Sequence, residues 1–82
     1  MDSKLNQEKL KMWQAKLKQT QKEYEAMVLL RGQAAAMGDL RENAAFQDAD
    51  EQSAVLSKRM SDIEKIITEL ENSDPPKKKG GS

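Results

Sequence analysis

The sequence predicts an all-α protein, an antiparallel two-helix coiled-coil hairpin with an acidic tip and a disordered C-terminal tail. Good helix formers such as leucine, alanine, glutamate and lysine dominate residues 3–72, whereas β-branched residues are few. Two stripes of mostly apolar residues recur at alternating spacings of three and four, which is typical of a coiled-coil seam. With 82 residues, of which 37% are apolar and 4% aromatic, the chain has too little material for a multilayered core.

The first predicted helix covers about residues 3–37. Its stripe is mostly apolar and consists of Leu10, Trp13, Leu17, Thr20, Tyr24, Met27, Arg31, Ala34 and Gly38. An aromatic side chain at seam spacing is usually part of a core, so we expect Trp13 and Tyr24 to pack between the helices and not to stack on bases.

The second predicted helix covers about residues 42–72. Its stripe consists of Glu42, Phe46, Ala49, Ser53, Leu56, Met60, Ile63, Ile67 and Leu70. If the two stripes face each other antiparallel, the numbers of facing residues add up to 80, as for Leu17 and Ile63. Facing pairs are large and apolar far from the turn and small or polar near it, which predicts a firm base and a slender tip. Arg31, near the tip, is expected to reach solvent or to pair with Asp48 or Asp50.

The predicted turn is formed by residues 38–41. Gly38 suits a left-handed position that closes the first helix. Asp39 is predicted to be the N-cap of the second helix, with Glu42 three residues later as the acidic member of a capping box. The second helix should end before Pro75, because a residue that precedes proline is disfavoured in a helix. We therefore assign residues 1–73 to the hairpin and residues 74–82 to a flexible tail or truncated linker.

The composition excludes several kinds of chemistry. The chain has no cysteine and no histidine, so it cannot form a disulfide framework, a zinc finger, a cysteine nucleophile or a histidine general base. Its longest apolar runs fall far short of the roughly 20 residues that a membrane span needs, and its N-terminus lacks the apolar segment of a secretory signal. We expect a soluble cytoplasmic protein with no membrane partner.

The net charge of zero conceals two segments of opposite charge. Residues 3–22 carry six lysines and one glutamate, a net charge of +5, whereas residues 32–57 carry five acids and one arginine, a net charge of −4. The lysines either only keep the surface of the helix soluble or contact phosphates. Asp39 and Glu42 either serve only as a cap or present two carboxylates to a partner. Two carboxylates can share a Mg²⁺ ion held mainly by another molecule, but they cannot enclose one alone.

One segment carries a family resemblance. Residues 38–46 resemble the G-D-L-x-E-N-A-x-aromatic signature at the hairpin tip of bacterial Gre transcript-cleavage factors, with the sequence Gly38-Asp39-Leu40-Arg41-Glu42-Asn43-Ala44-Ala45-Phe46. The detailed resemblance covers residues 34–52, and Phe46 stands where tyrosine is more usual. It implies that the hairpin enters the secondary channel of bacterial RNA polymerase. There it would stimulate the polymerase's own hydrolysis of backtracked RNA and would not be an enzyme itself.

The resemblance also implies roles for three residues. Asp39 and Glu42 would help the polymerase to hold Mg²⁺ and a water, and Asn43 would position the tip or the RNA. The Mg²⁺ would be supplied by the polymerase, and the protein would need no cofactor of its own. The basic face of the first helix would run along the extruded 3′ end of the RNA.

Three points stay open at the level of sequence. Gre factors carry a C-terminal docking domain that is not found in these 82 residues, so we expect either an isolated N-terminal domain or a shortened relative, with weak activity in isolation. Apolar residues off the seam suggest a docking site for that domain or a homodimer of the isolated hairpin, and they are Leu5, Met12, Val28, Leu29, Leu30, Val55 and Ile66. The two alternative functions are a secondary-channel inhibitor and a plain coiled-coil module whose tip acids only cap the second helix.

Overall fold

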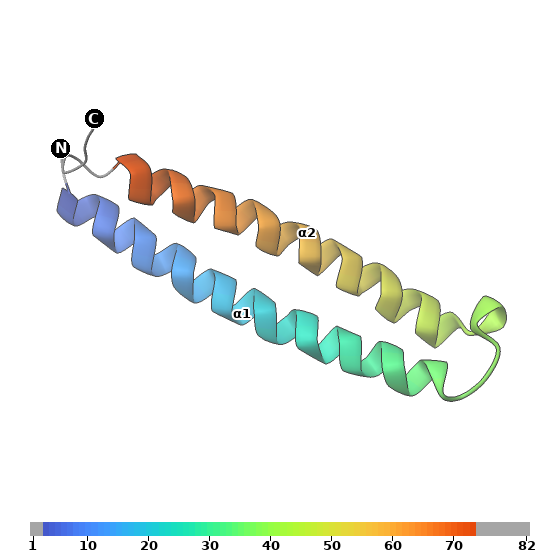
Figure 1. The fold of residues 1–82 in the computed structure, drawn as a ribbon. Helices are drawn as coiled ribbons and strands as arrows, with labels where there is room; N and C mark the ends of the chain where they lie inside the picture. Colours follow the sequence, from blue (N-terminus) through green and yellow to red (C-terminus); the bar gives the residue numbers. More distant parts are fainter. Residues whose placement is uncertain (1–2, 74–82) are drawn as a thin grey trace.

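The computed structural model describes residues 3–73, which form a hairpin of two antiparallel helices (Figure 1). Helix α1 spans Ser3–Ala35, a short 3₁₀ helix η1 spans Leu40–Glu42, and helix α2 spans Ala44–Ser73. The molecule measures 55 × 22 × 13 Å, and the turn lies at the opposite end from the start of α1 and the end of α2. The predicted all-α hairpin is confirmed, whereas the predicted tail, residues 74–82, lies outside the described residues.

The connection between the helices is longer than predicted. Helix α1 ends at Ala35 and not at residue 37, and α2 begins at Ala44 and not at residue 42. Gly38 lies in this connection with φ of 143°, a conformation that residues with a side chain rarely adopt. The turn therefore requires glycine at this position, although Gly38 lies three residues beyond the end of α1 and not directly after it.

The two predicted stripes form the interface between the helices. Every stripe position from Leu10 to Ala34 and from Phe46 to Leu70 is buried or half-buried, whereas the outermost stripe positions, Gly38 and Glu42, are exposed. The most enclosed residues are Thr20, Ala34, Ala49, Ser53, Leu56 and Ile63. Trp13 and Tyr24 are half-buried along this seam, so the prediction that they pack between the helices is confirmed.

The polar residues of the seam are satisfied locally or across the hairpin. The hydroxyl of Thr20 donates to the carbonyl oxygen of Lys16 at 2.8 Å, and the hydroxyl of Ser53 donates to the carbonyl oxygen of Asp50 at 2.8 Å. Such bonds within a helix satisfy the buried hydroxyl groups, so neither hydroxyl needs a partner on the other helix. Arg31 pairs with Asp50 across the hairpin at 2.9 Å, which confirms one of its two expected partners.

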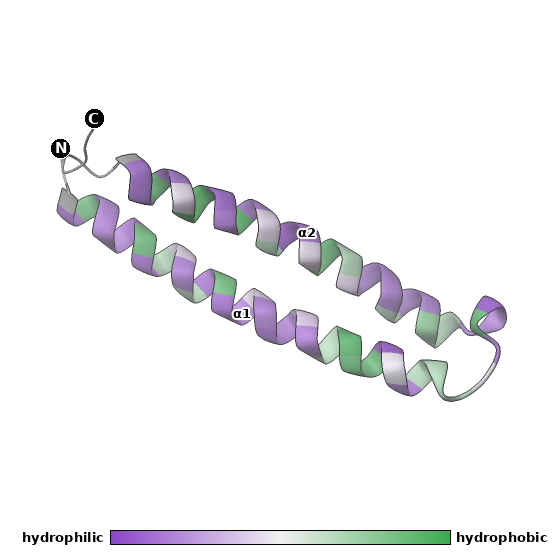
Figure 2. Cartoon of the chain, in the orientation of Figure 1, coloured by the Kyte–Doolittle hydropathy of each residue, from purple (hydrophilic) through white to green (hydrophobic). Residues whose placement is uncertain are grey.

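Hydrophilic and hydrophobic residues alternate along both helices, and hydrophobic residues are concentrated in one band of α1, in the half that leads to the tip (Figure 2). Leu29 and Leu30, which are 62% and 47% exposed, belong to α1 in this region. Within the described part of the chain, neither helix is long and apolar enough to cross a membrane.

Candidate functional site: the acidic hairpin tip

The tip begins with Asp39, which caps η1. Its side-chain oxygen Oδ1 accepts a hydrogen bond from the backbone N–H of Arg41 at 3.0 Å. Asp39 therefore starts the 3₁₀ helix and is not the N-cap of α2. The capping box predicted from Asp39 and Glu42 at the start of α2 is wrong, because Asp39 caps η1, Glu42 is the last residue of η1, and α2 begins only at Ala44.

Asn43 is the residue that caps α2. Its oxygen Oδ1 accepts from the backbone N–H of Phe46 at 2.9 Å, three residues later, as an N-cap side chain does. Its amide nitrogen Nδ2 also donates to the carbonyl oxygen of Ala34 at 2.7 Å, next to the last residue of α1. One half-buried side chain thus begins α2 and joins it to the end of α1.

Two further hydrogen bonds support η1, one that closes it and one that joins it to α2. The backbone N–H of Asn43 donates to the carbonyl oxygen of Leu40 at 3.4 Å, and the side-chain nitrogen of Gln47 donates to the carbonyl oxygen of Arg41 at 2.8 Å. The backbone between the helices is therefore supported at several points. Asp39 and Glu42 are attached to this supported segment.

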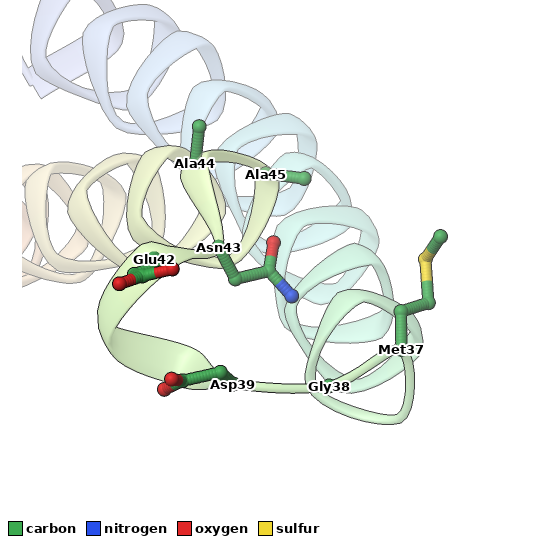
Figure 3. Close-up of a pocket in the computed structure, with 7 residues that line it drawn as sticks. All are labelled: Met37, Gly38, Asp39, Glu42, Asn43, Ala44 and Ala45. Carbon is green, nitrogen blue, oxygen red and sulfur yellow. The ribbon is translucent and has the colours of Figure 1, made fainter.

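The two tip acids line the same hollow and face solvent. Asp39 is the N-cap of η1, and Glu42 is its last residue. Figure 3 shows both carboxylates on the same side of the loop, whereas the side chain of Asn43 points the other way. Both residues are exposed, and within residues 3–73 the Glu42 carboxylate accepts no hydrogen bond and forms no ion pair.

The acids border an open hollow at the end of the molecule. It has a volume of about 410 Å³ and is lined by Met37, Gly38, Asp39, Glu42, Asn43, Ala44 and Ala45 (Figure 3). Nowhere in residues 3–73 do three side chains of the metal-binding types gather closely enough to hold a metal ion. The tip can therefore contribute one or two oxygen ligands to a metal ion that a partner also holds.

The three residues predicted for the site, Asp39, Glu42 and Asn43, all lie at the tip. The sequence did not predict that the side chains of Asn43 and Gln47 brace the turn. An asparagine directly before an alanine pair and an aromatic residue is itself an N-cap signal. Asp39 carries the same signal four residues earlier, and the sequence offers no local reason to choose between them.

The fold and the tip together define a slender coiled-coil hairpin that carries two solvent-facing carboxylates on a supported turn. The chain matches the family model described as "Transcription elongation factor, N-terminal", for the N-terminal domain of GreA and GreB, over residues 4–71. The protein therefore belongs to this family of Gre transcription elongation factors. The predicted resemblance is confirmed and extends well beyond the tip. No curated protein and no solved structure matches the chain significantly.

Proposed function

We propose that the hairpin enters the secondary channel of bacterial RNA polymerase and stimulates the polymerase's own cleavage of backtracked RNA. Family membership supports the role in transcription elongation. The observation that carries the finer proposal is that Asn43, and not an acid, caps α2. The carboxylates of Asp39 and Glu42 are therefore not needed to start the helix, and they face outward at the extreme end of the rod.

The chemistry proposed for the tip is that of metal ligands shared with a partner. Asp39 and Glu42 would hold, together with the polymerase, a Mg²⁺ that supplies Lewis acidity and a more acidic water for RNA hydrolysis. Asp39 keeps one carboxylate oxygen outside its bond to the backbone of Arg41, and Glu42 has both oxygens available within the described residues. Asn43 acts as a positioning residue, because its two hydrogen bonds fix the turn that carries the acids.

The stem of α1 is proposed to contact the RNA. All six lysines of residues 3–22 are exposed, and together they give this segment its net charge of +5. Phosphate contacts of this kind weaken as salt displaces them, so the stimulation should decline steeply as the salt concentration rises. On this proposal the protein acts in the cytoplasm on the polymerase and the 3′ end of the RNA.

The test is cleavage of labelled RNA in stalled, backtracked polymerase complexes with and without the protein. Asp39→Asn and Glu42→Gln should each lower the stimulation by about ten-fold or more, because each removes a charged metal ligand. Circular dichroism should show unchanged helix content, since neither side chain caps α2. Glu64→Gln, an exposed acid on the stem of α2, is the matched control and should cleave as the wild type does.

Each other outcome excludes the proposal in a different way. Undiminished cleavage by both tip variants would remove the acids from the mechanism. Inhibition of the polymerase by the wild-type protein would favour the alternative of a channel blocker. Absence of binding to the polymerase would leave only the alternative of a plain coiled-coil module.

A further inference from the structure

The outer face of α1, opposite the seam, carries a stripe of its own. Its members recur at spacings of three and four and are all exposed, and they are Leu5, Glu8, Met12, Ala15, Gln19, Lys22, Ala26, Leu29 and Gln33. Only two of these nine residues are charged. The corresponding outer stripe of α2 has six charged residues out of seven, namely Asp48, Glu51, Val55, Lys58, Asp62, Lys65 and Glu69. The outer face of α2 is that of a solvated helix, whereas the outer face of α1 has the composition of a weak coiled-coil seam.

The middle of the α1 stripe also contains small residues and a shallow hollow. A hollow of about 220 Å³ lies over Ala15, Lys18, Gln19 and Lys22. The methyl group of Ala15 leaves space between the longer side chains around it, and Ala26 repeats the small residue further along the same face. Small residues in a stripe allow two helices to approach closely. Met12 and Leu29, which are 56% and 62% exposed, are the large apolar side chains on either side of this centre.

We propose that this face binds a second copy of the chain. The two α1 helices run antiparallel, and the numbers of any two residues that face each other add up to 41. In this register Met12 of each copy faces Leu29 of the other, and Ala15 faces Ala26. Both large apolar side chains thus gain an apolar neighbour, and the two alanines meet beside the centre of the dimer. The surface belongs to α1 alone and does not involve the acidic tip.

Charge selects this arrangement. On each side of a coiled-coil seam, a row of residues flanks the seam along each helix. In an antiparallel coiled coil, each such row faces the equivalent row of the other helix. One flanking row of the α1 stripe then brings Lys16 opposite Glu23 of the other copy, and the other row brings Lys18 opposite Glu25. Two-fold symmetry repeats each pair, which gives four complementary pairs.

These four side chains are available for such pairs. Within residues 3–73 neither Lys16, Lys18 nor Glu25 forms an ion pair. Glu23 only accepts a long hydrogen bond of 3.4 Å from Gln19, four residues away in the same helix. The isolated hairpin therefore leaves all four charges facing solvent.

Other arrangements of the same two helices lose this complementarity. A shift of the register by one heptad in one direction places Lys16 opposite Lys16 of the other copy. A shift in the other direction places Glu23 opposite Glu23. A parallel dimer would align the lysine-rich segment of residues 3–22 with its copy. Like charges that face each other are destabilising, so the antiparallel register is the one that the charges favour.

The first test is sedimentation equilibrium over a range of concentrations at low salt. The wild-type chain should form a dimer that weakens as salt is added. Lys16→Glu combined with Lys18→Glu, and separately Glu23→Lys combined with Glu25→Lys, should each weaken the dimer by about ten-fold or more. An equal mixture of the two double variants should form a heterodimer again, because each facing pair regains opposite charges.

The second test concerns the apolar face and the orientation. Met12→Glu should abolish the dimer, whereas Val55→Glu, at a similarly exposed apolar residue on the outer face of α2, should leave it unchanged. Because the chain has no cysteine, a mixture of the Ala15→Cys and Ala26→Cys variants should form the mixed disulfide on oxidation in preference to either symmetric one. A monomeric wild type at millimolar concentration, failure of the charge-swapped mixture to pair, or preferential symmetric disulfides would each overturn the proposal.

Discussion

At the scale of single residues, Asn43 connects the two helices at the tip. Its side chain makes two hydrogen bonds, one to Phe46 N–H at the start of α2 and one to the Ala34 carbonyl at the end of α1. Asn43→Ala loses both, and we expect the free energy of unfolding to fall by about 1–3 kcal/mol. Urea denaturation followed by circular dichroism measures this change.

A serine at the same position separates the two bonds. Asn43→Ser keeps an oxygen that can cap α2 but lacks the amide group that reaches Ala34, so its stability should lie between those of the wild type and Asn43→Ala. Equal stability of the serine and alanine variants would show that the cap contributes nothing. Equal stability of the serine variant and the wild type would show that the bond to Ala34 contributes nothing.

The role of Asn43 could not be predicted from the sequence, whereas that of Gly38 could. Gly38 could be predicted because few other residues fit an unusual backbone angle in a turn. The choice between Asp39 and Asn43 as the cap of α2 could not, because both side chains suit an N-cap. The preference is decided by the position of the Ala34 carbonyl, which belongs to the other helix and is set only by the folded hairpin.

At the scale of the elements, the seam holds the hairpin together, and Ile63 is its most enclosed apolar residue at 3% exposure. Ile63→Ala should lower the free energy of unfolding by about 2–4 kcal/mol, because it removes buried methyl groups and leaves a cavity. Val55→Ala, at a residue that is 53% exposed, should change the stability by less than about 0.5 kcal/mol. Equal effects of the two substitutions, measured at a concentration where the chain is monomeric, would contradict the assignment of the seam.

The seam was the most predictable element of the fold. A stripe at spacings of three and four depends only on the geometry of a helix, and its positions from Leu10 to Ala34 are all buried or half-buried as expected. The ends of the helices were less predictable. Helix α1 stops at Ala35 although good helix formers continue to Met37. The chain turns there, and the Ala34 carbonyl oxygen accepts a hydrogen bond from the side chain of Asn43.

At the scale of the whole molecule, the two proposals compete for one surface. A second copy on the outer face of α1 would cover Lys16 and Lys18, which the proposed function turns toward RNA. It would also place another hairpin beside one that measures 22 × 13 Å in cross-section. The dimer would therefore offer fewer lysines to the RNA and a broader rod to the channel, so we infer that the monomer is the form that stimulates cleavage.

This inference predicts how cleavage depends on concentration. Stimulation per chain should fall once the protein concentration exceeds the dissociation constant of the dimer, because a growing fraction of chains has the α1 face covered. Met12→Glu leaves every lysine and both tip acids in place but should not dimerise, so its stimulation should rise until the polymerase is saturated, without this decline. Val55→Glu should behave as the wild type does. Identical curves for Met12→Glu and the wild type, at concentrations where sedimentation shows a wild-type dimer, would show that the dimer and the channel do not compete.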